Sequence, residues 1–173
     1  MSRVKVRDLM TTEVVTVGAN ETLDAAEQLM LAARIHHLPV VTRSKKLLGL
    51  VTQADLLRAQ VSIFAEVSPA EEASLMEAIP VAQVMTTAVC TIAPEDTAEH
   101  AARVMKRSKF GCLPVVVEGV VVGIVTEGDF VELAARALEA QTGDLLSLGE
   151  DTRAAVRGRA GAPQRHENKG NPP

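Results

Sequence analysis

Two short segments carry the hydroxyl and carboxylate groups that are best suited to bind a ligand. Thr52 to Asp55 has the sequence Thr-Gln-Ala-Asp, and Thr126 to Asp129 has Thr-Glu-Gly-Asp. Each follows an apolar run typical of a strand and opens a stretch typical of a helix. A helix start offers unpaired N–H groups that favour an anion. A carboxylate can accept from both hydroxyls of a ribose, and a threonine can donate to a phosphate oxygen, so the pattern suits a nucleotide.

The same spacing also has a purely structural interpretation. A threonine followed three residues later by an acid forms a capping box, in which the hydroxyl accepts from a backbone N–H and the acid reaches back. This device would serve both segments equally well without any ligand. Gly49 and Gly123 leave room for close backbone approach, and Pro39 and Pro114 fix the entry of the neighbouring strands. These four residues favour the ligand, but the capping interpretation stays open.

The two segments belong to a duplication. Three motifs occur twice in the same order, namely Met-Thr-Thr from Met10 and Met85, Leu-Pro-Val-Val from Leu38 and Leu113, and Gly-apolar-Val-Thr-x-x-Asp from Gly49 and Gly123. A repeat of about 75 residues is too long for a solenoid and suits two copies of one small unit packed together. Clefts between such units are common places for ligands to bind.

Each copy is predicted to contain a strand, a helix, two strands and a closing helix. The predicted strands are 14–17, 38–42 and 47–52 in the first copy, and 89–92, 113–117 and 120–126 in the second. Asn20 and Asp96 are the predicted N-caps of the first helices, and the closing helices should begin at Gln53 and Glu127. This mixture of helices and short strands predicts an α+β fold.

The predicted domain organisation follows the repeat. The boundaries are 1–60 for the first domain, 61–80 for a helical linker, 81–145 for the second domain and 146–173 for a tail. Ser68 and Pro69 predict the start of a linker helix that reaches Ile79. Its apolar residues could cover their own domain or a second chain. The tail, rich in Gly, Arg, Pro and Asn, is predicted to be disordered, with a weak contact to an acidic partner as the alternative.

Composition makes several other classes of protein unattractive. A net charge of -4, three Phe and no Trp or Tyr supply neither the basic stripe nor the stacking rings of a nucleic-acid binder. No apolar stretch approaches the roughly 18 residues of a membrane span, and the first residues do not resemble a signal peptide, so we expect a cytoplasmic protein. Cys90 and Cys112 lack CxxC spacing and are expected to be buried free thiols, not a disulfide or metal site.

The duplicated motifs, over about residues 4–60 and 79–140, resemble a pair of CBS domains, which join as a Bateman module. The resemblance implies tandem CBS domains, each β-α-β-β-α with a small mixed sheet, packed as a pseudo-twofold pair. It also implies two clefts that bind AMP, ADP, ATP or S-adenosylmethionine as a regulatory ligand, with no catalytic cofactor. Members of the family often form homodimers and regulate another protein, whose identity the sequence does not give.

The resemblance also implies roles for individual residues. By position, the ribose acids are Asp55 and Asp129, the phosphate-side hydroxyls Thr52 and Thr126, the apolar residues beside the base Leu50 and Ile124, and the cleft-lining threonines Thr16 and Thr91. The residues before Leu-Pro, which often contact base or phosphate, include Arg34, His36 and His37 in the first copy and Lys109, Gly111 and Cys112 in the second. Because the first copy has one fixed and two titratable cationic groups there, its cleft is expected to prefer phosphates more strongly.

The leading hypothesis is therefore a stand-alone regulatory module that binds an adenosine ligand and signals its occupancy to a partner. The alternative is a dimerisation scaffold whose clefts stay empty, and the capping-box interpretation supports it. Catalysis is not expected, because Gly-x-Ser-x-Gly, HExxH and Walker motifs do not occur. A metal site is not expected either, since His100 and His166 fall on a predicted helix and in the tail, away from the His36 and His37 pair.

Overall fold

The computed structural model describes residues 3–64 and 68–140, without the side chains of residues 61–64, 69, 70 and 72. Contacts divide the chain into a unit of Met1–Val131, which holds both repeats, and a unit that begins at Glu132. Each unit is described by itself. The predicted tail, 146–173, and the last residues of the predicted second domain lie outside the described residues.

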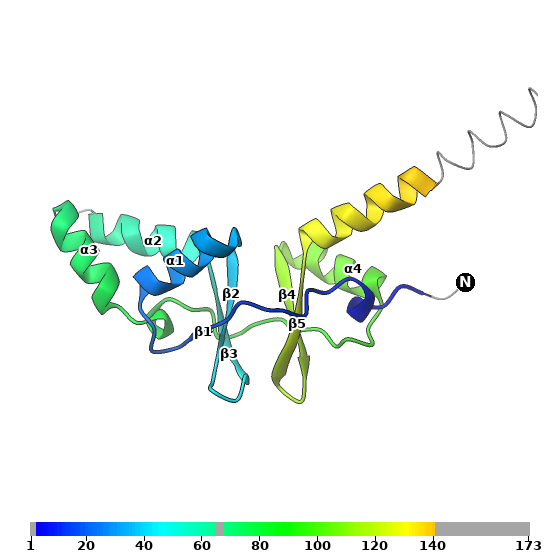
Figure 1. Cartoon of the computed structure of the whole chain (residues 1–173), viewed down its shortest axis with the longest axis horizontal. Helices are drawn as coiled ribbons and strands as arrows, with labels where there is room; N and C mark the ends of the chain where they lie inside the picture. Colours follow the sequence, from blue (N-terminus) through cyan, green and yellow to red (C-terminus); the bar gives the residue numbers. More distant parts are fainter. Residues whose placement is uncertain (1–2, 65–67, 141–173) are drawn as a thin grey trace, which may run out of the picture. The chain divides into compact units, whose positions relative to one another are not determined.

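The first repeat has a mixed three-stranded sheet (Figure 1). Strand β1 (Val17–Gly18) pairs in parallel with β2 (His37–Val41), and β2 pairs antiparallel with β3 (Leu47–Thr52). Helices α1 (Leu23–Ala33) and α2 (Gln53–Phe64) pack on these strands. The core between them contains Leu23, Ala26, Met30, Leu38, Val40, Val51 and Leu56. Apolar spacing along α1 therefore buries one face of this helix, with Leu23, Ala26 and Met30.

The second repeat has the same order of elements. Helix α4 (Ala98–Ser108) precedes the antiparallel hairpin of β4 (Cys112–Val117) and β5 (Val120–Thr126), and residues 127–140 are helical. The structure confirms the α+β prediction, both hairpins and the starts of both closing helices. None of the helices in ranges 3–64 and 68–140 is long and apolar enough to cross a membrane.

The first strand of each repeat is shorter than predicted. Only Val17 and Gly18 form a strand in the first repeat, and only Ile92 pairs in the second, through an isolated parallel bridge to Val115. The valines before them were expected to pair because β-branched residues favour strands. Instead, residues 12–16 and 87–91 run between the two repeats, so their backbones have no neighbouring strand to join.

The N-caps of α1 and α4 also differ from the prediction. The caps are Thr22, whose hydroxyl accepts from Ala25 N at 3.2 Å, and Thr97, whose hydroxyl accepts from His100 N at 3.1 Å. The Asp96 carboxylate accepts from Ala93 N at 2.9 Å and closes the turn before the helix. Because asparagine, aspartate and threonine all cap helices well, residue type alone did not separate these neighbouring positions.

The segment that opens each repeat packs into the core of the other repeat. Val6, in the 3-10 helix η1 (Val6–Asp8), is fully buried in the second core, and its N–H donates to Asp96 O at 2.9 Å. Val81, in η2 (Val81–Gln83), is fully buried in the first core, and its N–H donates to Glu21 O at 2.8 Å. Each repeat therefore completes the hydrophobic core of the other repeat.

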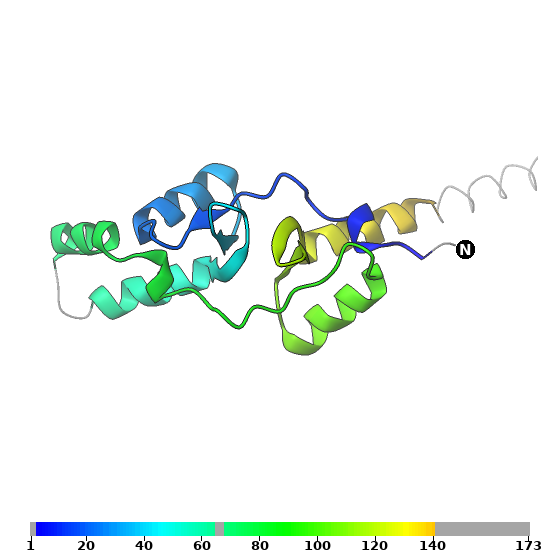
Figure 2. The ribbon, with the colours of Figure 1, turned by 90° about the horizontal axis from the view of Figure 1, so that it is seen from below.

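After these short helices the chain crosses from one repeat to the other, and we call residues 9–16 and 84–91 the crossing segments. Each crossing segment pairs with a strand of the opposite hairpin. Thr11 and Ile124 exchange two backbone hydrogen bonds, of 2.9 and 3.0 Å, and Thr86 and Leu50 exchange two of 2.9 Å. Figure 2 shows the two crossing segments, one blue and one green, running between the repeats. These four hydrogen bonds join each crossing segment to the opposite hairpin at two equivalent places.

Glycine makes this close approach possible. A Cβ added to Gly49 would lie 2.7 Å from Met85 Sδ and 2.9 Å from Thr86 O, and one added to Gly123 would lie 2.5 Å from Met10 Sδ and 3.2 Å from Thr11 O. The space that the sequence assigned to a ligand is therefore used by the Met-Thr-Thr motif of the opposite repeat.

The linker helix α3 (Pro69–Ala78) begins with the predicted cap. Ser68 N and Oγ donate to Glu71 at 2.8 and 2.7 Å, which lowers the pKa of the Glu71 carboxyl. Met76 is buried in the first core, and α3 packs on α1 and α2. The linker thus covers its own repeat, which was one of the two alternatives.

Replacing Gly49 by alanine tests the close approach. We expect Gly49→Ala to lower the free energy of unfolding by about 1–3 kcal/mol, because the added methyl group overlaps a backbone oxygen that cannot move independently. Gly18→Ala is the control, since its nearest contact is an ordinary 3.5 Å to the flexible side chain of Glu21. Urea unfolding measures both. Equal stabilities for the two variants would contradict this account.

Candidate functional site

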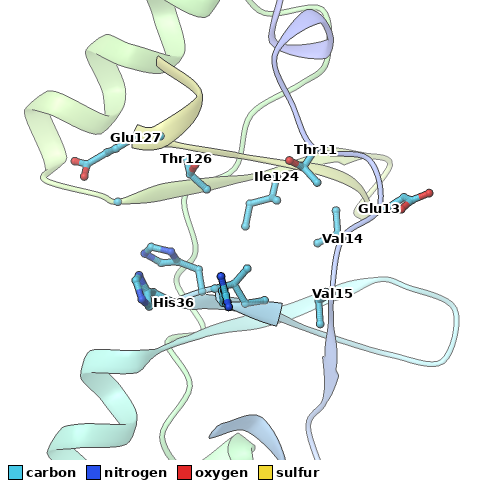
Figure 3. Close-up of a pocket in the computed structure, with 13 residues that line it drawn as sticks. Thr11, Glu13, Val14, Val15, His36, Ile124, Thr126 and Glu127 are labelled. Atoms are coloured by element: carbon cyan, nitrogen blue, oxygen red, sulfur yellow. The ribbon is translucent and has the colours of Figure 1, made fainter. Parts of the chain in front are cut away.

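Two clefts open beside the crossing segments, and both are built from residues of both repeats. Cleft 1 has a volume of about 390 Å³ (Figure 3). Its lining residues are Thr11, Glu13, Val14, Val15, Arg34, Ile35, His36 and His37 from the first repeat, and Gly111, Ile124, Thr126, Glu127 and Gly128 from the second.

Cleft 2 is the counterpart of cleft 1 with the repeats exchanged, and has a volume of about 280 Å³. Its lining residues are Thr86, Ala88, Val89, Cys90, Lys109, Phe110, Gly111 and Cys112 from the second repeat, and His37, Leu50, Thr52, Asp55 and Arg58 from the first. In each cleft, one repeat supplies the crossing segment and the residues before Leu-Pro, while the other supplies the end of a hairpin strand and the start of the closing helix. The exchange of segments therefore creates the clefts.

The helix start in cleft 2 is a closed hydrogen-bonded ring. Thr52 N and Thr52 Oγ1 both donate to Asp55 Oδ2, at 2.9 and 2.7 Å, and Asp55 N donates to Thr52 Oγ1 at 3.3 Å. The other carboxylate oxygen, Oδ1, accepts from Arg58 Nη1 at 2.7 Å. Asp55 is only 14% exposed at its side chain, whereas Arg58 is 74% exposed. The capping interpretation is thus correct here, and the second carboxylate oxygen pairs with an exposed side chain.

The helix start beside cleft 1 has two of these three hydrogen bonds. Thr126 N and Oγ1 donate to Asp129 Oδ2 at 2.6 and 2.9 Å. Thr126 lines cleft 1, but Asp129 is not among its lining residues. The two acids, equivalent in sequence, therefore differ in their access to a cleft.

Most of the sequence-predicted residues meet at these two clefts. Arg34, His36, His37, Ile124 and Thr126 line cleft 1, while His37, Leu50, Thr52, Asp55, Lys109 and Cys112 line cleft 2. The structure places the remaining threonines elsewhere. Thr16 lines a separate surface hollow beside α1, and Thr91 is exposed without lining either cleft. The crossing segments line the clefts through the residues just before these threonines, such as Val14 and Val15 in cleft 1.

His37 stands where the two clefts meet and lines both. Its ring lies against the opposite repeat, since a Cβ on Gly111 would lie 2.9 Å from His37 Nε2. Burial lowers the pKa of His37, and the neighbouring His36 lowers it further, against the opposing effects of Glu127 and Asp55. The absence of a side chain at Gly111 therefore makes room for a neutral imidazole between the clefts.

Each cleft has one cationic residue in an unusual backbone conformation. Arg34 and Lys109 end α1 and α4 with φ of 54° and 56°, in the left-handed region that glycine adopts most easily. Their side chains line clefts 1 and 2 respectively. A positive side chain at this position also interacts favourably with the helix C-terminus and is available to an anion in the cleft.

The cysteines have different surroundings. Cys112 is buried, and burial raises its pKa to about 12, so its thiol stays protonated and is a poor nucleophile or metal ligand. Cys90 is half-buried in the wall of cleft 2. Both are free thiols, as predicted, although only Cys112 is fully buried. Within the described part of the chain, no group of three potential metal ligands comes together.

Sequence reasoning did not identify several charged residues of the clefts. Glu13 and Glu127 line cleft 1, and Arg58 lines cleft 2. The comparison of the two copies held the necessary signal, because Glu13 corresponds to Ala88 and Glu127 corresponds to Gln53. Differences in charge between otherwise matching motifs mark positions where the two clefts differ.

The CBS domain family matches this chain twice, at residues 6–62 and 81–136. These ranges contain both crossing segments, both hairpins and the starts of both closing helices. The chain belongs to the CBS domain family.

Solved CBS pairs have the same fold. A Vibrio cholerae protein with the provisional name acetoin utilization protein is 42% identical, with a TM-score of 0.69 over 82% of this chain and 98% of that one. The CBS pair of protein MJ0100, solved with 5′-methylthioadenosine and S-adenosyl-L-methionine, is 25% identical, with a TM-score of 0.68 over 79% and 99%. CBSX2 of Arabidopsis thaliana, solved with AMP, is 28% identical, with a TM-score of 0.65 over 78% and 98%.

Some relatives of this CBS pair are longer proteins. A homoserine O-acetyltransferase of Methanococcus vannielii is 36% identical over 127 residues, which is 73% of this chain. The chain spans only 24% of that protein's length.

The half-buried His37 of this CBS pair predicts a pH dependence of stability. Because the pKa of His37 is lower in the folded protein than its ordinary 6.5, the unfolded chain binds more protons between these two values. The contribution of the neutral His37 to the free energy of unfolding is therefore fully present above pH 6.5 and is lost as the pH falls toward the pKa of His37 in the folded protein. Urea unfolding from about pH 8 down to about pH 5.5 should show a smaller loss of stability for His37→Gln than for wild type.

The control for this measurement is His100→Gln, an exposed position on α4 outside both clefts. It should keep the pH dependence of the wild type. Equal pH dependence in wild type and His37→Gln would show that His37 does not become neutral on folding.

Proposed function

We propose that this CBS pair is a regulatory module that binds adenosine-containing ligands in clefts 1 and 2 and signals their occupancy to a partner protein in the cytoplasm. The observation that carries the proposal is the pair of equivalent clefts, each with a threonine at a helix start on one wall and a cation, Arg34 or Lys109, on another. Hydroxyl, cation and apolar wall are the groups that phosphate, ribose and base require.

The ligands of the two similar structures support the chemical class. 5′-Methylthioadenosine, S-adenosyl-L-methionine and AMP share an adenosine group and differ in what the 5′ carbon bears. In cleft 2, the apolar side chain of Leu50 and the carboxylate of Asp55 lie on the same wall. A base beside Leu50 and a ribose beside Asp55 would use both, with the ribose hydroxyls replacing the exposed Arg58 as partner of Asp55 Oδ1.

Signalling would follow from the construction of the clefts. Any ligand in either cleft contacts residues of both repeats, so it favours the arrangement of repeats that closes on it. A partner that binds one arrangement better then responds to the ligand. We propose this regulatory role, and not catalysis, for the CBS repeats that the chain shares with longer enzymes.

Isothermal titration with AMP tests the proposal in cleft 2. We expect Asp55→Asn to weaken AMP binding about tenfold or more, because a ribose hydroxyl loses a hydrogen bond to a charged acceptor. Asp96→Asn is the matched control, since Asp96 makes a similar 2.9 Å bond to a backbone N–H outside the clefts. Its affinity for AMP should equal that of the wild type.

The competing function is a scaffold with empty clefts, which the hydrogen-bonded rings at Thr52 and Thr126 favour. In that case Asp55→Asn and Thr52→Ala would lower the melting temperature by weakening a helix cap, and neither AMP nor 5′-methylthioadenosine would bind the wild type. That result would replace the ligand proposal by the scaffold.

We propose in addition that the pair forms a homodimer through apolar groups on its helices. Leu31 and Leu57 are 69% and 53% exposed and line one groove between α1 and α2. Light scattering should give a dimer for wild type at micromolar concentration and a monomer for Leu31→Glu combined with Leu57→Glu, because burying two carboxylates is costly. Arg43→Glu, in the exposed turn after β2, should remain dimeric. A monomeric wild type would contradict the proposal.

A further inference from the structure

Clefts 1 and 2 are equivalent in construction but not in charge. Glu13 and Glu127 line cleft 1. At the matching positions of the other repeat, the chain has Ala88, which lines cleft 2, and Gln53, which begins α2. Two carboxylates of cleft 1 therefore have uncharged counterparts.

The other charged groups add to this difference. Cleft 1 has one fixed cation, Arg34, against its two carboxylates, whereas cleft 2 has Lys109 and Arg58 against Asp55 alone. With histidines counted as neutral at pH 7, cleft 1 is formally negative and cleft 2 formally positive. This order is the reverse of the expectation drawn from Arg34, His36 and His37 alone.

Glu127 is the more effective of the two carboxylates. Figure 3 shows Glu127 at the same end of cleft 1 as His36 and Glu13 at the opposite end, with both carboxylates directed outward. The charge of Glu127 also acts on His37. A phosphate placed near the imidazoles would therefore meet a like charge, which weakens binding and disfavours that class of ligand.

We propose that the two clefts divide adenosine ligands by charge. Cleft 2 takes a 5′-phosphorylated adenosine such as AMP, and cleft 1 takes an adenosine whose 5′ group is neutral or cationic, such as 5′-methylthioadenosine or S-adenosylmethionine. The inference rests on the proposed function, because it requires that adenosine ligands bind at all. One chain would then respond to two kinds of metabolite through two equivalent sites.

Methyl-labelled protein allows each cleft to be followed separately by NMR. Ile124 lines cleft 1 and Leu50, its counterpart in the repeat, lines cleft 2. AMP should shift the Leu50 signals at a concentration at least about tenfold lower than it needs to shift the Ile124 signal, because the formal charges of the two clefts differ by two units. 5′-Methylthioadenosine should shift Ile124 at a concentration no higher than it needs for Leu50.

Charge exchange between the clefts then tests the cause. Glu13→Ala combined with Glu127→Gln gives cleft 1 the residues of its counterpart and should tighten AMP binding at Ile124 about three- to tenfold. Ala88→Glu should weaken AMP binding at Leu50 by a similar factor relative to Ala88→Gln, which has nearly the same size. 5′-Methylthioadenosine is the internal control, because an uncharged ligand should change by less than about twofold in each comparison.

The outcomes separate the two proposals. If neither ligand shifts either signal, the proposed function itself fails. If both ligands bind but AMP occupies the two clefts with equal affinity, adenosine binding stands and the division by charge is wrong. The same conclusion follows if replacing Glu13 and Glu127 leaves the affinity of cleft 1 for AMP unaltered. Preserved chemical shifts of methyl groups far from the clefts show that each variant is folded.

Discussion

The reciprocal exchange of crossing segments is the interaction on which the rest of this structure depends. Each repeat buries a valine that belongs, in sequence, to the other: Val6 enters the second core and Val81 the first. Hydrogen-bond pairs at Thr11 with Ile124 and at Thr86 with Leu50 fix the segments beyond these anchors. Neither repeat is complete alone, because each would lose a fully buried side chain and an edge partner for its hairpin.

The exchange also determines what the clefts can be. A crossing segment leaves one repeat beside the hairpin of the other, so each cleft necessarily has one wall from each repeat. Gly49 and Gly123 allow the contact, and Gly111 allows His37 to stand between the clefts. Small residues at three positions thus convert two separate folds into one unit with two related sites. A ligand in either site would contact both sides of the same interface, so the proposed binding would be coupled to the arrangement of the repeats.

The parts of the fold that could be predicted are those with local causes. Apolar runs and turn residues identified both hairpins, and the Thr-x-x-Asp spacing identified the starts of the closing helices. The exchange could not be predicted, because no local property of Val6 states which core will bury it. The same tertiary cause shortened the first strands and moved the cleft wall from Thr16 to Val14 and Val15.

The candidate site shows a similar division. Motif positions predicted the residues that both copies share, such as Thr52 and Thr126, because a duplication preserves construction. They did not predict the balance of charge, which depends on residues where the copies disagree. The imidazole of His37 illustrates the reason, because its type suggests a cation but burial against Gly111 favours the neutral form. Glu127, which the motif suggested only as a helix start, has an exposed side chain beside cleft 1. The proposed selectivity between the equivalent clefts therefore depends on the positions where the two copies differ in charge.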